Sequence, residues 1–413
     1  MENYRVALIK QNEQGIEQTV RTAIDTAGGL KELLTGDSKV IIKPNLNQPA
    51  ASGSGLVTDA RVTEAVTKAV LDCSPGSVKI ADGAAAGYDF IGAVSTGESF
   101  RMSGTEEIAR RLGVEIVNCN ADDFVDLTIE NPYVMDRVKL SKTVYEADVI
   151  ISVPVLKTHH RTITTISLKN MKGVMLGEEK RKTHLLGLDP GIADLISVIK
   201  PHYTVVDALT IMQGNWEPED KRELGLILAG ASPHATDYIG TYLIGFDPGK
   251  VMHLTYSMKR EGISLDMETI EVLGESLEES RAFFKTGFDV IRSRYPEVSI
   301  IEGKSSCSGC IGQLIGALSN IRAAGFGDNL SGITVVMGSP VEERVPEEKV
   351  LFLGKCSAHY GDKKNSISGC PPKEETIIKK LGELCGFPVN AVIEQRDRQR
   401  KQTWESTKKA LRT

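Results

Sequence analysis

Short apolar runs alternating with helical segments constrain the fold of this chain more than any other sequence feature. Ser38–Lys43 and Ala147–Pro154 are apolar at nearly every position, so both of their faces must be buried. The expected strands are Tyr4–Lys10, Ser38–Lys43, Ser77–Ala81, Val114–Asn118, Ala147–Pro154, Tyr203–Asp207 and Gly225–Ala229. Segments of helical periodicity separate them, for example Gly15–Ala27 and Arg61–Cys73. This alternation predicts an α/β fold whose large domain holds a mostly parallel sheet covered on both faces.

The composition changes in the last third of the chain. From about Ser276 the chain is more charged, and we expect the strands Ile333–Met337 and Val350–Leu353 to begin a smaller α/β domain. We therefore predict a large domain over residues 1–265 and a small, metal-dependent domain over residues 266–413. With two short strands the small domain offers little core. It ends in a basic helix that we interpret as a solvated surface helix.

Charge and hydropathy exclude several classes of protein. The net charge of −6 argues against nucleic-acid binding, which needs a basic face. No apolar run approaches the roughly 20 residues that span a membrane, and Met1–Arg5 does not resemble the start of a signal peptide. The seven cysteines are an odd number, which does not fit a secreted disulfide framework. We expect a cytoplasmic protein from a reducing, low-oxygen cell, with no membrane partner.

Four of the cysteines are concentrated near the end of the chain, and they are the candidate metal ligands Cys307, Cys310, Cys356 and Cys370. Four thiolates suit either a 4Fe–4S cluster or structural zinc. Apolar helices are expected directly after Cys310 and after Pro371–Pro372, and helix N-termini stabilise an anionic cluster. A zinc site usually has a second Cys-x-x-Cys pair, whereas Cys356 and Cys370 stand alone. The pattern favours a 4Fe–4S cluster, with zinc as the alternative.

The sequence Gly369-Cys-Pro-Pro372 before a helix resembles the cluster-bearing small subunits of nickel–iron hydrogenases and of respiratory complex I. The match covers a few residues, so it implies a cluster and nothing about hydrogen or quinone.

A second group of polar residues follows the expected strands of the large domain. Ligands bind at strand ends in open α/β sheets, and a crowd of lysines there calls for a negative partner. The candidate catalytic residues are Lys157, His159 and Lys169, and the candidate substrate-binding residues are Lys43, Asn45, Asp59, Asn170, Lys172 and Asp207. The alternatives are that each lysine is solvated and that Asp207 only caps a turn. Together the residues predict a lysine-lined cleft for an anionic small molecule.

The blocks Ile41–Asn45, Leu156–His159, Leu168–Gly173, Val205–Asp207 and Ile244–Pro248 resemble the signatures of domain of unknown function 362. The resemblance covers residues 4–265 in order. It implies an iron–sulfur centre, which many members carry, but the appended Cys-x-x-Cys-x-x-Cys module of many relatives is not found here. The family name implies no reaction.

Three functions fit these features. The first is a redox enzyme that passes electrons through the cluster to or from the bound anion, with a ferredoxin-type protein as electron donor. The second is a hydro-lyase or isomerase in which an iron with an open position acts as a Lewis acid. The third is a non-catalytic carrier or assembly protein with a structural cluster.

Overall fold

A computed structural model describes residues 4–85, 96–159, 162–177, 179–214, 218–285, 287–303, 306, 308–369 and 372–410. The chain forms two compact units, Met1–Phe284 and Lys285–Thr413. The first unit runs past residue 265 because the strand Ile270–Gly274 pairs with the N-terminal strand. The two units are described separately.

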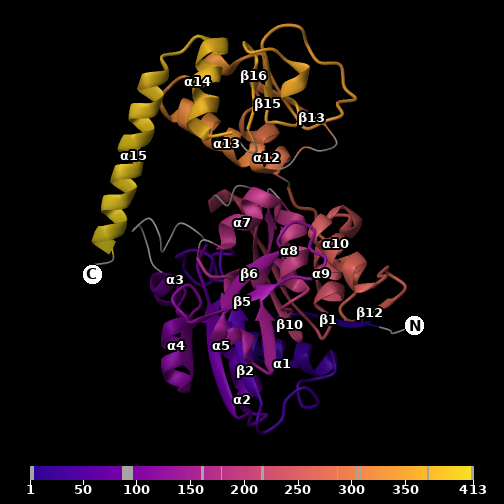
Figure 1. The fold of residues 1–413 in the computed structure, drawn as a ribbon. Coiled ribbons are helices and arrows are strands. Elements are labelled where there is room, and N and C mark those ends of the chain that lie inside the picture. The colour runs from indigo at the N-terminus through magenta and orange to yellow at the C-terminus, as the bar shows by residue number, and fades with distance from the viewer. Residues whose placement is uncertain are drawn as a thin grey trace. The chain divides into compact units, whose positions relative to one another are not determined.

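A ten-stranded sheet forms the centre of the first unit (Figure 1). Its main path runs β12 (Ile270–Gly274), β1 (Tyr4–Lys10), β11 (Lys221–Gly230), β10 (Tyr203–Met212), β7 (Val149–Val153), β2 (Lys39–Pro44), β3 (Ser77–Asp82) and β4 (Glu115–Asn118). Along this path only β11 runs antiparallel to its neighbours. The predicted α/β fold with a mostly parallel sheet is therefore confirmed. β8 (Val155–His159) also pairs with β10, and β9 (Ile163–Thr165) pairs with β8.

Helices cover both faces of this sheet. Ile42 and Ile151 belong to the core under α1 (Gly15–Thr26) and α2 (Ala60–Leu71). Their neighbours Ile41 and Ile150 belong to the opposite core, under α8 (Leu188–Ile196) and α10 (Met252–Glu261). Alternate residues of one strand thus enter different cores, which explains the continuous apolar runs. The other helices of this unit are α3 (Thr96–Met102), α4 (Thr105–Leu112), α5 (Lys142–Tyr145), α6 (Ser167–Asn170), α7 (Glu179–Leu186), α9 (Pro233–Leu243) and α11 (Leu277–Ser280), with short 3-10 turns η1 (Met171–Val174), η2 (Pro218–Asp220) and η3 (Pro248–Lys250). β5 (Phe124–Thr128) and β6 (Arg137–Ser141) form a separate antiparallel pair.

The chain reverses its direction of travel across the sheet between β2 and β7. From β2 it moves outward through β3 to β4, and it then returns to the other side of β2 as β7 and continues to β10. In open α/β sheets the helices that follow neighbouring strands diverge at such a point, at the carboxyl ends of the strands. This topological switch point is where an α/β sheet most often binds a ligand.

The second unit contains a four-stranded parallel sheet in the order β13 (Val298–Glu302), β14 (Ile333–Met337), β15 (Val350–Leu353) and β16 (Ser366–Ile367). Its helices are α12 (Gly287–Arg294), α13 (Ser308–Ala323), α14 (Glu374–Cys385) and α15 (Val389–Ala410), with 3-10 turns η4 (Gly327–Leu330) and η5 (Ala358–Tyr360). Leu314, Leu318 and Val335 are fully buried between helices and sheet. The expectation of two strands with little core was therefore wrong, because β13 and β16 complete a sheet that α13 covers.

One strand of the first unit is longer than predicted. Asp207 does not end its strand, because β8 takes over from β7 as the neighbour of β10 just where Asp207 pairs with Val155. The ladder therefore continues to Met212. Within the described part of the chain, no helix combines the length and the apolar character needed to cross a membrane.

Candidate functional sites

A buried ion pair lies at the carboxyl ends of β2 and β3. Lys43 Nζ is 2.6 Å from Asp82 Oδ1, and the two side chains are 0% and 2% exposed. The other oxygen of Asp82 accepts the Leu46 N–H at 2.6 Å. Asp82 was missed in the sequence, although an acid at the end of a buried apolar strand is an available signal. Because Asp82 offsets its charge, Lys43 positions the strand ends rather than offering a free ammonium group.

Gly173 closes over this ion pair. A Cβ at this position would collide with Asp82 Oδ1 and would lie 2.6 Å from Lys43 Nζ. Only glycine lets the backbone approach so closely. The segment after α6 is thereby pressed onto the ends of β2 and β3.

Two asparagines extend the network from Lys43 to Lys157. Asn170 Oδ1 accepts from Lys43 Nζ at 3.0 Å and from Asn45 Nδ2 at 3.2 Å. Asn170 Nδ2 donates to the Lys43 carbonyl and to Ser152 Oγ, both at 3.0 Å. Asn45 Oδ1 in turn accepts from Lys157 Nζ at 3.2 Å. The predicted residues Lys43, Asn45, Lys157 and Asn170 therefore share one hydrogen-bonded network across the switch point.

Lys157 fastens the loop that joins β2 to α2. Its Nζ donates to Asn47 Oδ1 at 3.2 Å and to the Leu56 carbonyl at 2.5 Å. Burial, followed by the charge of Lys169, lowers the pKa of Lys157 well below its usual range. The positive charge of Lys169 therefore lies close enough to Lys157 to act on its amine.

Asp59 and Asp207 form a second, acidic part of the same loop. The Asp59 N–H donates to Asp207 Oδ2 at 2.7 Å, and the Asp59 carboxylate caps α2 through the Arg61 N–H at 2.9 Å. Burial would raise the pKa of Asp59, but hydrogen bonds from Arg61 and Ser52 outweigh burial and lower it. Burial raises the pKa of Asp207 to about 7. Both carboxylates are engaged by the loop and by the start of α2, so in this structure they shape the site.

The remaining predicted residues lie on segments beside the network. Lys169 Nζ is 3.2 Å from Thr165 Oγ1, and the Thr162 N–H donates to His159 Nδ1 at 3.3 Å. Both side chains are half-buried, as is that of Lys172. Of these three residues, Lys169 is the one whose charge acts on Lys157, where it helps burial to lower the pKa of that amine.

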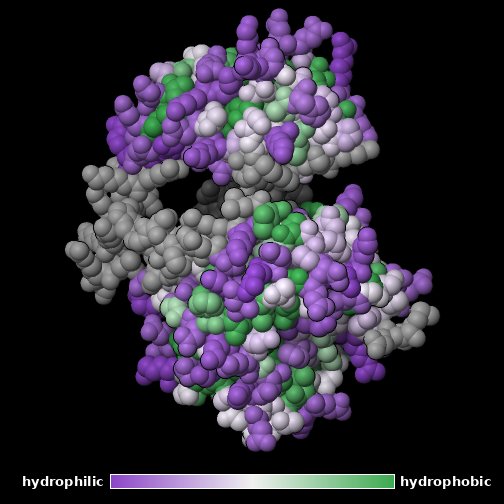
Figure 2. Space-filling view, viewed as in Figure 1, coloured by the Kyte–Doolittle hydropathy of each residue, from purple (hydrophilic) through white to green (hydrophobic). Residues whose placement is uncertain are grey.

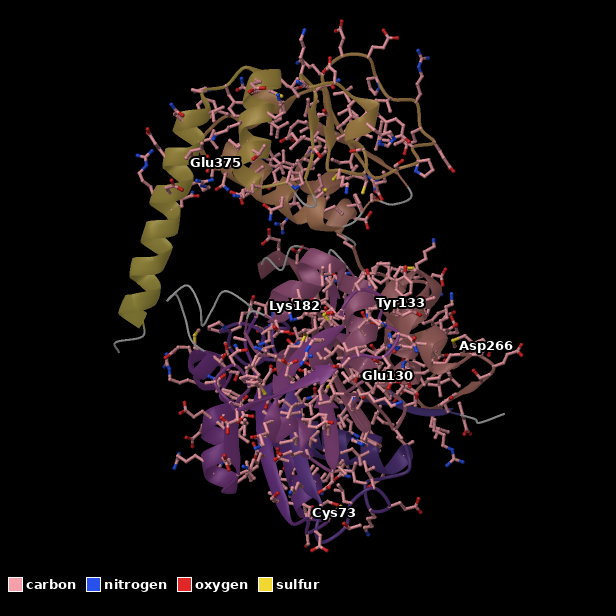
Figure 3. All side chains as sticks on the ribbon, in the orientation of Figure 1. Cys73, Glu130, Tyr133, Lys182, Asp266 and Glu375 are labelled. Atoms are coloured by element: carbon pink, nitrogen blue, oxygen red, sulfur yellow. The ribbon has the colours of Figure 1, made fainter. Side chains whose placement is uncertain are left out.

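A further buried lysine, Lys180 on α7, was not anticipated. Its Nζ donates to the carbonyls of Gly83 and Ala84 at 2.9 and 2.8 Å and to Asn120 Oδ1 at 2.6 Å. Nothing in the sequence around Lys180 marks it, because its partners come from distant segments. Lys182, two residues further along the chain, and Cys73 mark opposite ends of the first unit in Figure 3.

In the second unit, the segments that carry the predicted cysteine ligands meet at the carboxyl ends of the parallel strands. The Gly354 N–H donates to the Ile367 carbonyl at 2.9 Å, and the Lys355 N–H donates to the Gly369 carbonyl at 2.8 Å. A Cβ at Gly354 would lie 2.6 Å from Cys310 Sγ. Cys310 is thus packed against the turn that precedes Cys356, and this turn is paired with the residue that precedes Cys370.

Cys310 is buried and Cys356 is exposed, while Cys307 and Cys370 lie outside the described residues. Among the described residues, no three His, Cys, Asp or Glu side chains are arranged to hold a metal ion. The segments flanking all four cysteines nevertheless converge, since Ser306 packs against Gly338 at the end of β14. Thiolates brought to one edge by a rigid sheet are a suitable donor set for iron or zinc.

The match to a protein family falls within the first unit. The model of the family described as "Domain of unknown function (DUF362)" matches residues 40–242. This segment is similar to the DUF362 family. The predicted resemblance is therefore confirmed for this part of the chain, and the matched residues of the DUF362 segment include Lys43, Asn45, Lys157, Asn170 and Asp207. The resemblance of the Gly-Cys-Pro-Pro segment to hydrogenase and complex I subunits stays a prediction.

A thylakoid-associated protein of Synechocystis sp. is 26% identical over 244 residues, which are 56% of this chain and 71% of that protein. Two solved structures are similar at 12% identity. The match to the lactate racemase apoprotein from Thermoanaerobacterium thermosaccharolyticum covers 81% of this chain and 69% of the racemase chain, with a TM-score of 0.39. The match to a protein from Thermotoga maritima covers 79% of this chain and 71% of that protein chain, with a TM-score of 0.37. At these TM-scores neither structure identifies an activity for the DUF362 segment.

Proposed function

We propose that this chain is an iron–sulfur redox protein. In this proposal Cys307, Cys310, Cys356 and Cys370 hold a 4Fe–4S cluster in the second unit, and the DUF362 segment binds the anionic small molecule that exchanges electrons with it. The observation that carries the proposal is the packing of Cys310 Sγ against Gly354, beside the hydrogen bond from Lys355 to Gly369.

The local structure around the cysteines supports a cluster. α13 begins at Ser308, between Cys307 and Cys310, and α14 begins at Glu374, shortly after Cys370. Free N–H groups in the first turn of a helix stabilise negative charge, which a thiolate-bound cluster carries. When bound, the cluster would supply one-electron chemistry. The chain's own contribution is to hold the sulfur atoms at the edge of a rigid sheet.

Two features of the first unit support binding of an anion. The network of Lys43, Asn45, Lys157 and Asn170 lies at the topological switch point, between the ends of β2 and β7. Lys169 adds a positive charge near Lys157. In the proposal Lys169 attracts the anion, and the amine of Lys157 and the amides of Asn45 and Asn170 orient it. The ion pair of Lys43 with Asp82 keeps the strand ends in place.

The test is to purify the protein anaerobically and measure iron, acid-labile sulfide and zinc. We expect about four iron and four sulfide per chain, as in a 4Fe–4S centre. Cys310→Ser and Cys356→Ser should each lose iron. Cys119→Ser is the matched control, because Cys119 is buried in the first unit. Stoichiometric zinc without iron would overturn the cluster proposal.

The anion proposal is tested separately by thermal-shift titration with phosphate and a set of small mono- and dicarboxylates. We expect at least one of these probes to stabilise the protein. Lys169→Gln should weaken its binding by about 1.5–3 kcal/mol, the range for a hydrogen bond to a charged group. Lys200→Gln is the control, because Lys200 pairs with Glu261 at 2.5 Å and is half exposed. An equal effect of both substitutions would contradict a binding role for Lys169.

A further inference from the structure

We propose that the described residues of the stretch 355–373, which we call the basic segment, are the docking surface for a small acidic iron–sulfur protein. The inference rests on the proposed function, because it places the electron-transfer partner next to the cysteines that would hold the cluster. It names a partner by charge and size and assigns a surface that recognises it.

The charge of the basic segment is opposite to that of the chain as a whole. It contains four lysines and one aspartate, a net charge of +3, whereas the whole chain has a net charge of −6. Lys355, Lys363, Lys364 and Lys373 are all exposed. The carboxylate of Asp362 accepts the Lys364 and Asn365 N–H groups at 2.7 and 3.2 Å, so it serves the turn. Hydrophilic residues cover much of the visible face of this unit (Figure 2).

The lysines are placed close to the proposed cluster ligands. Lys355 directly precedes Cys356, which is exposed, and Lys373 follows Cys370 by three positions. The hydrogen bond from the Lys355 N–H to the Gly369 carbonyl joins these two parts of the segment. The Lys363 carbonyl accepts from Lys380 Nζ at 3.4 Å, which places Lys363 against α14, the helix that Lys373 caps. Positive charge therefore lies beside Cys356, where a proposed sulfur ligand reaches the surface.

An aromatic pair gives the same surface an anchor. The ring centroids of His359 and Tyr360 are 4.0 Å apart, and Tyr360 is 43% exposed. The Tyr360 hydroxyl is 3.1 Å from Ser339 Oγ, which fixes the direction of the ring. Tyrosine is one of the residue types that contribute most to binding at protein interfaces.

Charge complementarity selects an acidic partner. Opposite charge accelerates association by about 10–10³-fold and orients the encounter, which suits a brief complex. A nucleic acid or an anionic membrane would also be attracted by lysines, but the net charge of −6 repels an extended polyanion that reaches beyond the segment. A small globular partner contacts only the basic segment, so a small acidic protein is the better fit.

The experiment measures binding of an oxidised plant-type ferredoxin to the anaerobically purified full chain by calorimetry. The test variant is Lys355→Gln with Lys373→Gln. The matched control is Lys349→Gln with Lys379→Gln, which removes the same charge from exposed positions of the same unit outside the basic segment. We expect the test variant to raise the dissociation constant about tenfold at low salt and the control to change it less than twofold. The difference should disappear near 1 M salt, where the screening length falls to about 3 Å.

Iron and sulfide are measured on the same preparations, which separates the two proposals. If the cluster is present but both variants bind ferredoxin like the parent, the docking surface is wrong and the proposed function stands. If the anaerobic protein contains no iron, the proposed function fails and the docking proposal fails with it. A test variant that loses binding to RNA or to anionic vesicles, with ferredoxin binding unchanged, would assign the surface to another partner and overturn the inference.

Discussion

Gly354→Ala tests the arrangement of the cysteine segments most directly. The backbone at Gly354 has φ of +96°, and an added Cβ would lie 2.6 Å from Cys310 Sγ. A residue with a Cβ costs about 1–2 kcal/mol in the left-handed region. Forcing a group into a packed position costs a further 1–3 kcal/mol or so. We therefore expect a loss of about 2–5 kcal/mol in the free energy of unfolding of the second unit.

Gly325→Ala separates the two contributions. Gly325 has φ of +87°, in the same unit, and nothing lies within 4 Å of its added Cβ. This control carries the backbone cost alone, so the difference between the two variants measures the contact with Cys310. We expect Gly354→Ala to be less stable than Gly325→Ala by about 1–3 kcal/mol.

Urea denaturation of the metal-free protein, followed by fluorescence and by limited proteolysis of each unit, measures this difference. Iron content after anaerobic expression is the second readout, because a displaced sulfur atom should no longer hold a cluster. Gly325→Ala should keep its iron, whereas Gly354→Ala should lose it. Equal stability and equal iron content in the two variants would refute the proposed packing of Cys310 against this turn.

Three further outcomes are expected. Lys43→Met should destabilise the first unit by about 3–5 kcal/mol in urea denaturation because it leaves the Asp82 charge buried, and adding Asp82→Asn should restore most of the loss. The pKa of the buried His234 is lowered to about 4, so the folded protein keeps this ring neutral while the unfolded chain protonates it below about pH 6.5. Stability should therefore fall by about 3 kcal/mol as the pH drops from 6.5 to 4, and His234→Asn should reduce that dependence when denaturation is repeated across this range. Cys385→Ser should leave the iron content of anaerobic protein unchanged, since Cys385 is the last residue of α14, at the end of the helix far from Cys370; loss of iron would add it to the ligand set.

Much of the first unit could be predicted because its signals are local. Ile41 and Ile42 are both apolar, which requires a strand buried on two faces, and β2 is such a strand. Asp207 could not be placed, because its strand continues only where β8 replaces β7 as its neighbour. β16 was missed because two residues carry no periodic signal, and it forms only by pairing with β15.

The candidate sites also combine features that local sequence predicts with contacts that depend on the tertiary structure. The sequence places Lys43, Asn45, Lys157 and Asn170 after apolar runs, and their gathering at one edge follows from the parallel sheet. It does not reveal that Asp82 takes up the charge of Lys43, because ion pairing depends on which strands become neighbours.

The sequence by itself determined the alternation of strands and helices, the residue types at the strand ends and the concentration of cysteines. These are properties of short segments, where periodicity and side-chain chemistry act locally. Only the tertiary structure decided which charges are buried and paired, and which segments meet. The packing of Cys310 against Gly354 joins residues from separate strand–helix units, so it depends on the register and order of β13 to β16. Long-range pairing is set by the whole core, and no single segment encodes it.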